Sequence, residues 1–160
     1  MIDPSTGELS FNGGGVKFGK STTPAALPPD AVDAPGPDLV ASMKSKALGV
    51  LDAGDGAKFW TALDFFGDAL VSARLKAVDP RFPPDLTDWS LDREMARHDH
   101  HCLSLRRDLG WLWRLRRYPW GRVQALCGRN LDKTPRESII KVIYVEFAAV
   151  EELVAREFTS

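Results

Sequence analysis

The sequence predicts one α+β domain, with a mainly antiparallel sheet of about five or six strands and one long helix packed on a face of it. Three observations predict this class. A chain of 160 residues suits one ordinary domain, so residues 1–160 are expected to fold as a unit. Two adjacent runs, 58–66 and 69–78, have the residue types of strands. A later run, 90–109, has the spacing of an amphipathic helix.

A β-hairpin is expected at the start of the chain. Residues 8–12 and 16–18 alternate apolar with polar side chains around the turn signal Asn12-Gly13. Five prolines follow between Lys20 and Pro37, and they predict a proline-rich loop over residues 20–37.

A short helix is expected next, in the N-terminal half. Asp38 can cap its first turn and Gly54 can end it. Its apolar face would consist of Leu39, Val40, Met43, Ala47 and Leu51.

The long helix is the best-marked element of the sequence. Ser90 is its expected N-cap, Asp92 and Glu94 suit the positive end of its dipole, and Gly110 ends it. Six residues at four- and three-residue steps are expected to face the sheet: Leu91, Met95, His98, Cys102, Leu105 and Leu109.

The C-terminal third is expected to add two strands. Residues 123–127 follow the turn sequence Tyr118-Pro119-Trp120-Gly121, and residues 138–147 are apolar on both faces, as in a central strand. The tail, residues 145–160, would include a short helix over 148–158.

A phosphate-loop pattern occurs at Gly14–Ser21, with the sequence GGVKFGKS. Such a loop functions when a helix begins directly after it, so that backbone N–H groups surround the phosphates. Three prolines follow Ser21 within eight residues, and the alternation of Val16 and Phe18 is that of a strand. We therefore interpret the pattern as part of the hairpin and expect no nucleotide cofactor.

The charge distribution is uneven along the chain. The net charge is −1, but nine basic and three acidic side chains lie between Leu103 and Glu137, which makes this segment basic and the remainder acidic. The balanced total argues against bulk attraction to nucleic acid or to acidic membranes. The chain has no secretory signal and no apolar run long enough to span a bilayer, so we expect a cytoplasmic protein.

All three histidines lie within the run His98-Asp99-His100-His101-Cys102. On a helix, His98 could approach a metal together with His101 or Cys102, and Glu94 lies one turn earlier. Stable zinc sites take more ligands than this run supplies, so we expect no metal here, while a metal-dependent enzyme at His98–Cys102 remains an alternative. The sequence identifies no nucleophile and base pair, and we expect no enzymatic activity.

An arginine–aromatic segment follows the long helix. We expect it to bind a partner through seven residues: Trp111, Trp113, Arg114, Arg116, Arg117, Tyr118 and Arg122. Tryptophan, tyrosine and arginine are the residue types enriched at protein–protein hot spots. The same types could bind RNA phosphates and stack on bases, or could anchor the core, so a basic RNA-associated accessory protein is a second alternative.

Several separated pieces of the chain together resemble a family of small bacterial proteins whose pattern is that of immunity proteins of interbacterial toxin systems. The pieces are Ile2-Asp3-Pro4, Phe11-Asn12-Gly13, Val16-Lys17-Phe18-Gly19, Trp60, Asp88-Trp89-Ser90, Glu94, His101, Tyr118-Pro119-Trp120-Gly121 and Ile139-Ile140-Lys141-Val142-Ile143-Tyr144. The resemblance covers residues 2 to about 144, and the proline-rich loop and the tail exceed the family pattern.

The resemblance implies a protein without a reactive group of its own, which neutralises a cognate protein toxin by covering its active site or by blocking substrate entry. A surface with separate acidic and basic regions is consistent with such a role, since complementary charge selects a partner. The sequence leaves open whether the acidic or the basic region would contact the toxin.

Overall fold

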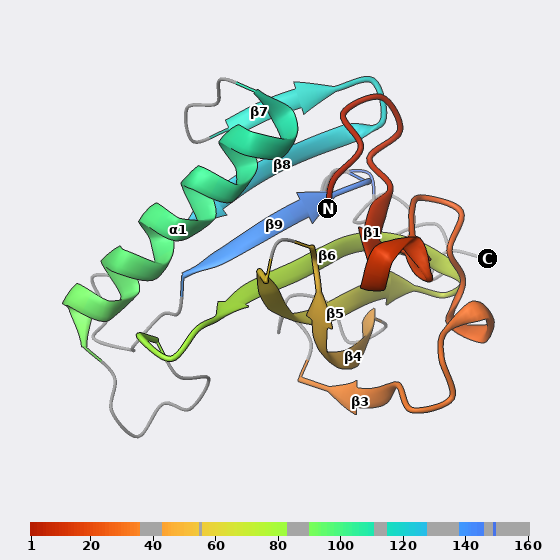
Figure 1. Ribbon diagram of the computed structural model, residues 1–160. Helices are drawn as coiled ribbons and strands as arrows, with labels where there is room; N and C mark the ends of the chain where they lie inside the picture. The colour runs from red at the N-terminus through yellow and green to blue at the C-terminus, as the bar shows by residue number, and fades with distance from the viewer. Residues whose placement is uncertain are drawn as a thin grey trace.

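The computed structural model describes residues 1–35, 43–54, 56–82, 90–110, 115–127, 138–145 and 149. The large sheet has seven strands. Figure 1 shows helix α1 (Leu91–Leu109) along one of its faces. The predicted α+β class is confirmed, and the sheet has more strands than the five or six expected.

Every neighbouring pair of strands in the large sheet is antiparallel. The strands lie in the order β3 (Val32–Ala34), β4 (Met43–Asp52), β5 (Lys58–Phe66), β6 (Ala69–Val78), β9 (Ile139–Ile143), β8 (Gly121–Leu126) and β7 (Leu115–Tyr118). β9 therefore enters between β6 and the β7–β8 hairpin, although it follows both in sequence. The predicted strands at 58–66 and 69–78 are confirmed with the same bounds.

The predicted N-terminal hairpin is also confirmed. β1 (Leu9–Phe11) pairs with β2 (Val16–Phe18) across the 3₁₀ turn η1 (Asn12–Gly14). After Ser21 the chain forms only a 3₁₀ turn, η2 (Pro24–Ala26), before β3. Only the centre of the phosphate-loop pattern, Val16–Phe18, is thus a strand, and no α-helix begins in the twelve described residues that follow the pattern.

One face of the sheet carries the core. The hairpin residues Leu9 and Phe11 are buried there with Phe59, Leu63 and Leu75 of the central strands. Leu105 and Leu109 of α1 close the same cluster. Burial of each such side chain contributes about 1.5–3 kcal/mol, so this cluster fixes the hairpin and the helix on the same face.

The predicted short helix with Met43, Ala47 and Leu51 on its apolar face is wrong for the part that the structure describes. Residues 43–52 form β4, which is paired on both sides. A bulge between Ala47 and Gly49 shifts the register, and Gly49 has a φ of 73°. Because the bulge inserts one residue into the strand, Leu48 and Leu51 both pack against the core. Their three-residue separation resembles the spacing of apolar residues in a helix. Leu39 and Val40 lie outside the described residues.

Helix α1 has the predicted bounds and caps. The Ser90 hydroxyl accepts the backbone N–H of Arg93 at 3.3 Å, and Gly110 ends the helix with a φ of 77°. The predicted buried stripe is only half correct, because Leu105 and Leu109 are buried whereas Leu91 and Met95 are 42% and 45% exposed. The helix is rotated so that a polar stripe faces the sheet.

Of the C-terminal predictions, the two strands are observed and the helix lies mostly outside the described residues. The strands expected at 123–127 and 138–147 are observed as β8 and β9, with shifted ends. β7 was not expected, because its residues were interpreted only as a binding segment. The helix predicted at 148–158 lies outside the described residues except for position 149. Among the described residues, no helix combines the length and apolarity needed to cross a membrane.

Candidate functional site

Two polar regions of the structure could carry function. The first lies between α1 and the sheet, and we call it the buried network: Glu94, Arg97, His101 and Ser138. The second lies at the turn between β7 and β8, and we call it the turn pocket: Lys20, Arg117, Tyr118, Pro119, Trp120, Gly121 and Tyr144. Their burial and hydrogen bonding differ in ways that separate a structural role from a binding role.

In the buried network, Glu94 is the central acceptor. Its carboxylate accepts a short hydrogen bond from the Arg97 guanidinium, and its other oxygen accepts the backbone N–H of Ser138 at 2.5 Å. Arg97 also donates to the carbonyl oxygen of Phe82 at 3.1 Å, and its guanidinium lies 5.5 Å from the centre of the Phe82 ring. All these partners are buried, so Glu94 ties the first turns of α1 to the start of β9.

His101 occupies the gap where β6 and β9 separate. Its Nε2 accepts the backbone N–H of Ala77 at 2.9 Å, two positions beyond Leu75, the last residue of β6 that pairs with β9. Its Nδ1 lies 3.0 Å from the Ser138 hydroxyl. Burial lowers the pKa of His101 to about 3, with smaller contributions from the nearby charges of His100 and Arg97. The ring is therefore neutral, with its proton on Nδ1.

This protonation state decides what His101 can do. Since Nε2 accepts a hydrogen bond, Nδ1–H donates to Ser138, and His101 does not remove the proton of the Ser138 hydroxyl. Both ring nitrogens are occupied by protein groups, which leaves none for a metal. His101 therefore replaces a missing strand partner instead of serving as a base or a ligand.

The rest of the histidine run supplies a smaller donor set. His98 Nε2 lies 3.6 Å from the Cys102 sulfur, one helical turn away. His100 packs against Phe59 and Phe82. No group of three or more histidine, cysteine, aspartate or glutamate side chains suited to a metal occurs within the described ranges.

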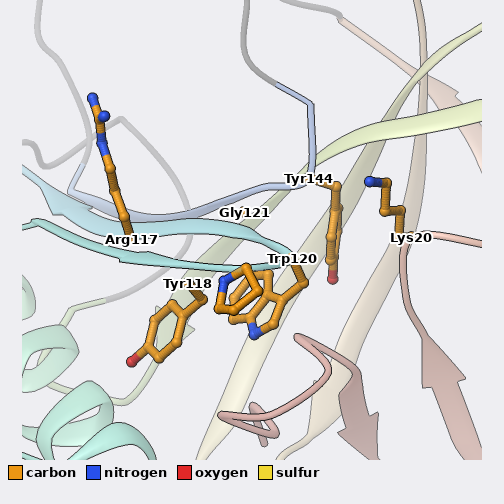
Figure 2. Close-up of a pocket in the computed structure, with 7 residues that line it drawn as sticks. Lys20, Arg117, Tyr118, Trp120, Gly121 and Tyr144 are labelled. Carbon is orange, nitrogen blue, oxygen red and sulfur yellow. The ribbon is translucent and has the colours of Figure 1, made fainter.

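The turn pocket has a volume of about 250 Å³ and opens at the rim of the sheet. Figure 2 shows the Trp120 ring in its wall, with Lys20 on one side and Arg117 on the other. Lys20 belongs to the segment after β2, and Arg117 belongs to β7. Both side chains are exposed, and neither forms an ion pair or a hydrogen bond within the described part of the chain.

The wall of the turn pocket is rigid. The Tyr118 and Trp120 rings are stacked, with centres 4.8 Å apart and planes inclined by 8°. Gly7 approaches the Trp120 ring so closely that an added Cβ would collide with it. The indole Nε1–H donates to the carbonyl of Pro4 at 3.0 Å, and the Tyr144 hydroxyl donates to the carbonyl of Gly7 at 2.9 Å.

These contacts fix the N-terminal segment against the β7–β8 turn. The Trp120 ring is stacked on Tyr118 and closely approached by Gly7, and the residue is 8% exposed. Burial raises the pKa of Tyr144, which keeps its hydroxyl protonated as a donor. Trp120 and Tyr144 are thus structural, and the exposed chemistry of the pocket is cationic.

Positive charge continues from the pocket over the sheet face opposite α1. The register places Arg117 directly opposite Arg122, and places Lys141 directly opposite Arg74. Burial lowers the pKa of Lys141, and the charges of Arg74 and Arg122 lower it further against the opposing effect of Asp64. Asp64 is itself buried and accepts hydrogen bonds from Ser45, Ser72 and Arg74.

Only some of the seven predicted partner-binding residues lie at the turn pocket. Arg117 lies in the turn pocket, Tyr118 forms its wall, and Arg122 is half-buried on the neighbouring strand. Arg116 is on β7, but its side chain is not described. Trp111, Trp113 and Arg114 lie outside the described residues. Sequence reasoning did not connect Lys20 and Tyr144 with this segment, since no local pattern reveals that these distant residues meet there.

No family model, curated protein or solved structure matches this chain. Several pieces on which the resemblance to immunity proteins rests nevertheless meet in space. Pro4, Trp120 and Tyr144 meet at the turn pocket, and Glu94 and His101 meet in the buried network. Their positions indicate that these particular residues maintain the fold.

Proposed function

We propose that this protein is a non-enzymatic immunity protein, which acts in the cytoplasm by binding and neutralising a cognate bacterial toxin. The observation that carries the proposal is the pair of exposed cations, Lys20 and Arg117, at a rigid rim of the sheet. The aromatic support beneath these cations is already ordered, so binding has to order only the two exposed side chains.

The position of the predicted binding segment supports this role. β7 is the last strand in the order of the described sheet, so residues 115–118 lie at its margin. Arg117 is exposed there, while the neighbouring Tyr118 and Trp120 are held by their stacking. A partner can therefore contact the margin of the sheet without disturbing the core.

The absence of a catalytic role is part of the proposal. The residues that pattern analysis offers for chemistry are engaged in structural contacts, with His101 neutral and bonded through both nitrogens. The pair His98 and Cys102 supplies two donors, fewer than zinc sites use.

Binding to RNA is the alternative that shares the same cations. Single-stranded RNA is usually held by bases that stack on open aromatic faces. Trp120 is 8% exposed and is stacked on Tyr118, which favours a protein partner over RNA.

The test is co-expression with the toxin encoded beside its gene. We expect cells to survive the toxin only when this protein is present, and we expect the two proteins to copurify in a fixed ratio. Cells that die although the protein is folded and abundant would contradict the proposal, as would rescue without any physical complex.

A further inference from the structure

We propose that the turn pocket is a subsite for an acidic segment of a partner protein, in which one carboxylate contacts Lys20 and a second contacts Arg117. The inference rests on the proposed function only for the identity of the partner as a toxin. Its chemical content, an acidic peptide across a cationic rim, stands on the pocket itself.

The arrangement of the cations requires an extended ligand. Figure 2 shows Lys20 beside Tyr144 and Arg117 at the far side of Trp120, with the guanidinium directed away from the rings. One small anion at either cation would leave the other unpaired. A peptide segment with carboxylates at intervals can contact both and lie across the wall between them.

The surrounding charge favours an acid. Arg122 and Lys141 lie on the same sheet face as Arg117, because each directly opposite pair in the register shares a face. Both side chains are half-buried, so they add to the positive potential around Arg117 without being contacts, and this potential raises the rate at which an acidic segment associates.

The same charges disfavour a second copy of this chain at this margin. Pairing two β7 strands edge to edge would bring Arg116 and Arg117 of each copy close together. Charged side chains on margin strands commonly prevent such association. The occupant is accordingly a different, acidic chain.

The wall of the pocket argues against a nucleobase. Since Trp120 is 8% exposed and is stacked on Tyr118, a ligand contacts the cations at the rim and not the indole ring. Carboxylates on a flexible backbone satisfy this geometry without any stacking.

The experiment is an NMR titration of the full ¹⁵N-labelled chain with hexaglutamate peptide, observed at the backbone amides and at the Trp120 indole N–H. Hexaglutamine, inorganic phosphate and a uridine decanucleotide serve as comparison probes. We expect saturable shifts centred on Lys20, Arg117, Trp120 and Tyr144 with hexaglutamate, and no saturable shifts there with hexaglutamine.

Variants then separate a defined subsite from general charge. The double variant Lys20→Gln, Arg117→Gln should weaken hexaglutamate binding by about tenfold or more, because it removes both contacts. The matched variant Lys44→Gln, Lys58→Gln removes two exposed lysines from β4 and β5 and should change the affinity by less than about twofold. The melting temperature of each variant shows that its fold is intact.

Three results would overturn the inference: an equal loss in both variants, shifts centred elsewhere, or saturable binding of the decanucleotide or phosphate in place of the peptide. The outcome is independent of the toxin test. Hexaglutamate binding at the pocket without toxin binding would leave the subsite standing and defeat the immunity function. Toxin binding without saturable hexaglutamate binding at the pocket would leave the immunity function standing and defeat the subsite.

Discussion

The buried network and the turn pocket both contain charged and aromatic side chains, but the charged groups are buried in the first and exposed in the second. In the buried network Glu94, Arg97 and His101 are removed from water, and each forms hydrogen bonds with protein groups. In the turn pocket Lys20 and Arg117 remain exposed while the aromatic side chains beneath them are fixed. Polar groups in the first region stabilise the fold, and those in the second are available to a partner.

The comparison shows why residue type alone misleads. The histidine run attracts attention as a possible reactive site, yet His101 completes hydrogen bonds where two strands separate. The sequence assigns no binding role to Lys20, the lysine of the phosphate-loop pattern, yet this residue lies in the turn pocket. Burial and partners distinguish the two cases, and both depend on contacts between distant parts of the chain.

The largest expected effect is at Glu94. Replacing Glu94 with alanine leaves the Arg97 charge buried without its carboxylate, and should lower the free energy of unfolding by about 3–5 kcal/mol. Urea denaturation measures this loss. Glu94→Gln keeps an acceptor and should lose less, while Glu8→Ala, which breaks an exposed pair with Lys17, should cost less than about 1 kcal/mol. Equal losses at Glu94 and Glu8 would show that the network is not structural.

The next effect is a loss of stability in mild acid. The pKa of His101 is about 3 in the folded chain and 6.5 ordinarily, so between these values the unfolded state binds a proton that the folded state does not. The contribution of neutral His101 to the free energy of unfolding is therefore complete above pH 6.5. It is lost as the pH falls, by up to about 1.4 kcal/mol per pH unit.

The variant His101→Gln isolates this contribution. Burial also lowers the pKa of His100, which acts with the same sign, so the difference between variant and wild-type slopes is the relevant quantity. Above about pH 4.5 most aspartates are still ionised and add little to the slope. Parallel stability curves for both proteins between pH 4.5 and 6.5 would contradict the assignment.

A smaller effect is expected at the support of the turn pocket. Tyr144→Phe removes the hydrogen bond to the Gly7 carbonyl and should destabilise the fold by about 1 kcal/mol. Thermal unfolding measures the shift. Hydrogen exchange of the amides of residues 2–10 should accelerate more than that of α1, because the lost bond anchors the N-terminal segment. A uniform acceleration would show that the contact is not local.

The smallest effect on stability is expected at the rim. Arg117→Gln alters an exposed side chain without an ion pair in the described chain, and should change the free energy of unfolding by less than about 0.5 kcal/mol. Chemical denaturation beside Glu94→Gln gives the comparison. A loss as large as that at Glu94 would place Arg117 in the fold and not at a binding surface.

The sequence could predict elements whose signals are local. Ser90 and Gly110 mark the ends of α1, and the turn at Gly67 marks the β5–β6 hairpin. β4 was missed because its bulge at Gly49 hides the alternation of a strand. The orientation of α1 was missed because two of its charged residues, Glu94 and Arg97, become buried through contacts outside the helix. Glu94 contacts Ser138, and Arg97 contacts Phe82.

The candidate site was less predictable than the fold. The arginine–aromatic segment indicates that a surface exists, and Arg117 and Tyr118 belong to the pocket. Lys20 and Tyr144 reach it through the packing of Gly7 on Trp120, which requires a glycine at a φ of 74° and a turn more than one hundred residues away. Only the folded chain brings these requirements together.

The most direct test of the central claim is the dissociation constant for the toxin encoded beside the gene. It should be measured at one ionic strength for three proteins. These are the wild type, the pocket double variant with Lys20→Glu and Arg117→Glu, and the matched double variant with Lys44→Glu and Lys58→Glu. We predict that the pocket variant binds at least about tenfold more weakly with an unchanged melting temperature, and that the matched variant binds like the wild type. Equal affinity for all three proteins would contradict the assignment of the turn pocket as the binding surface.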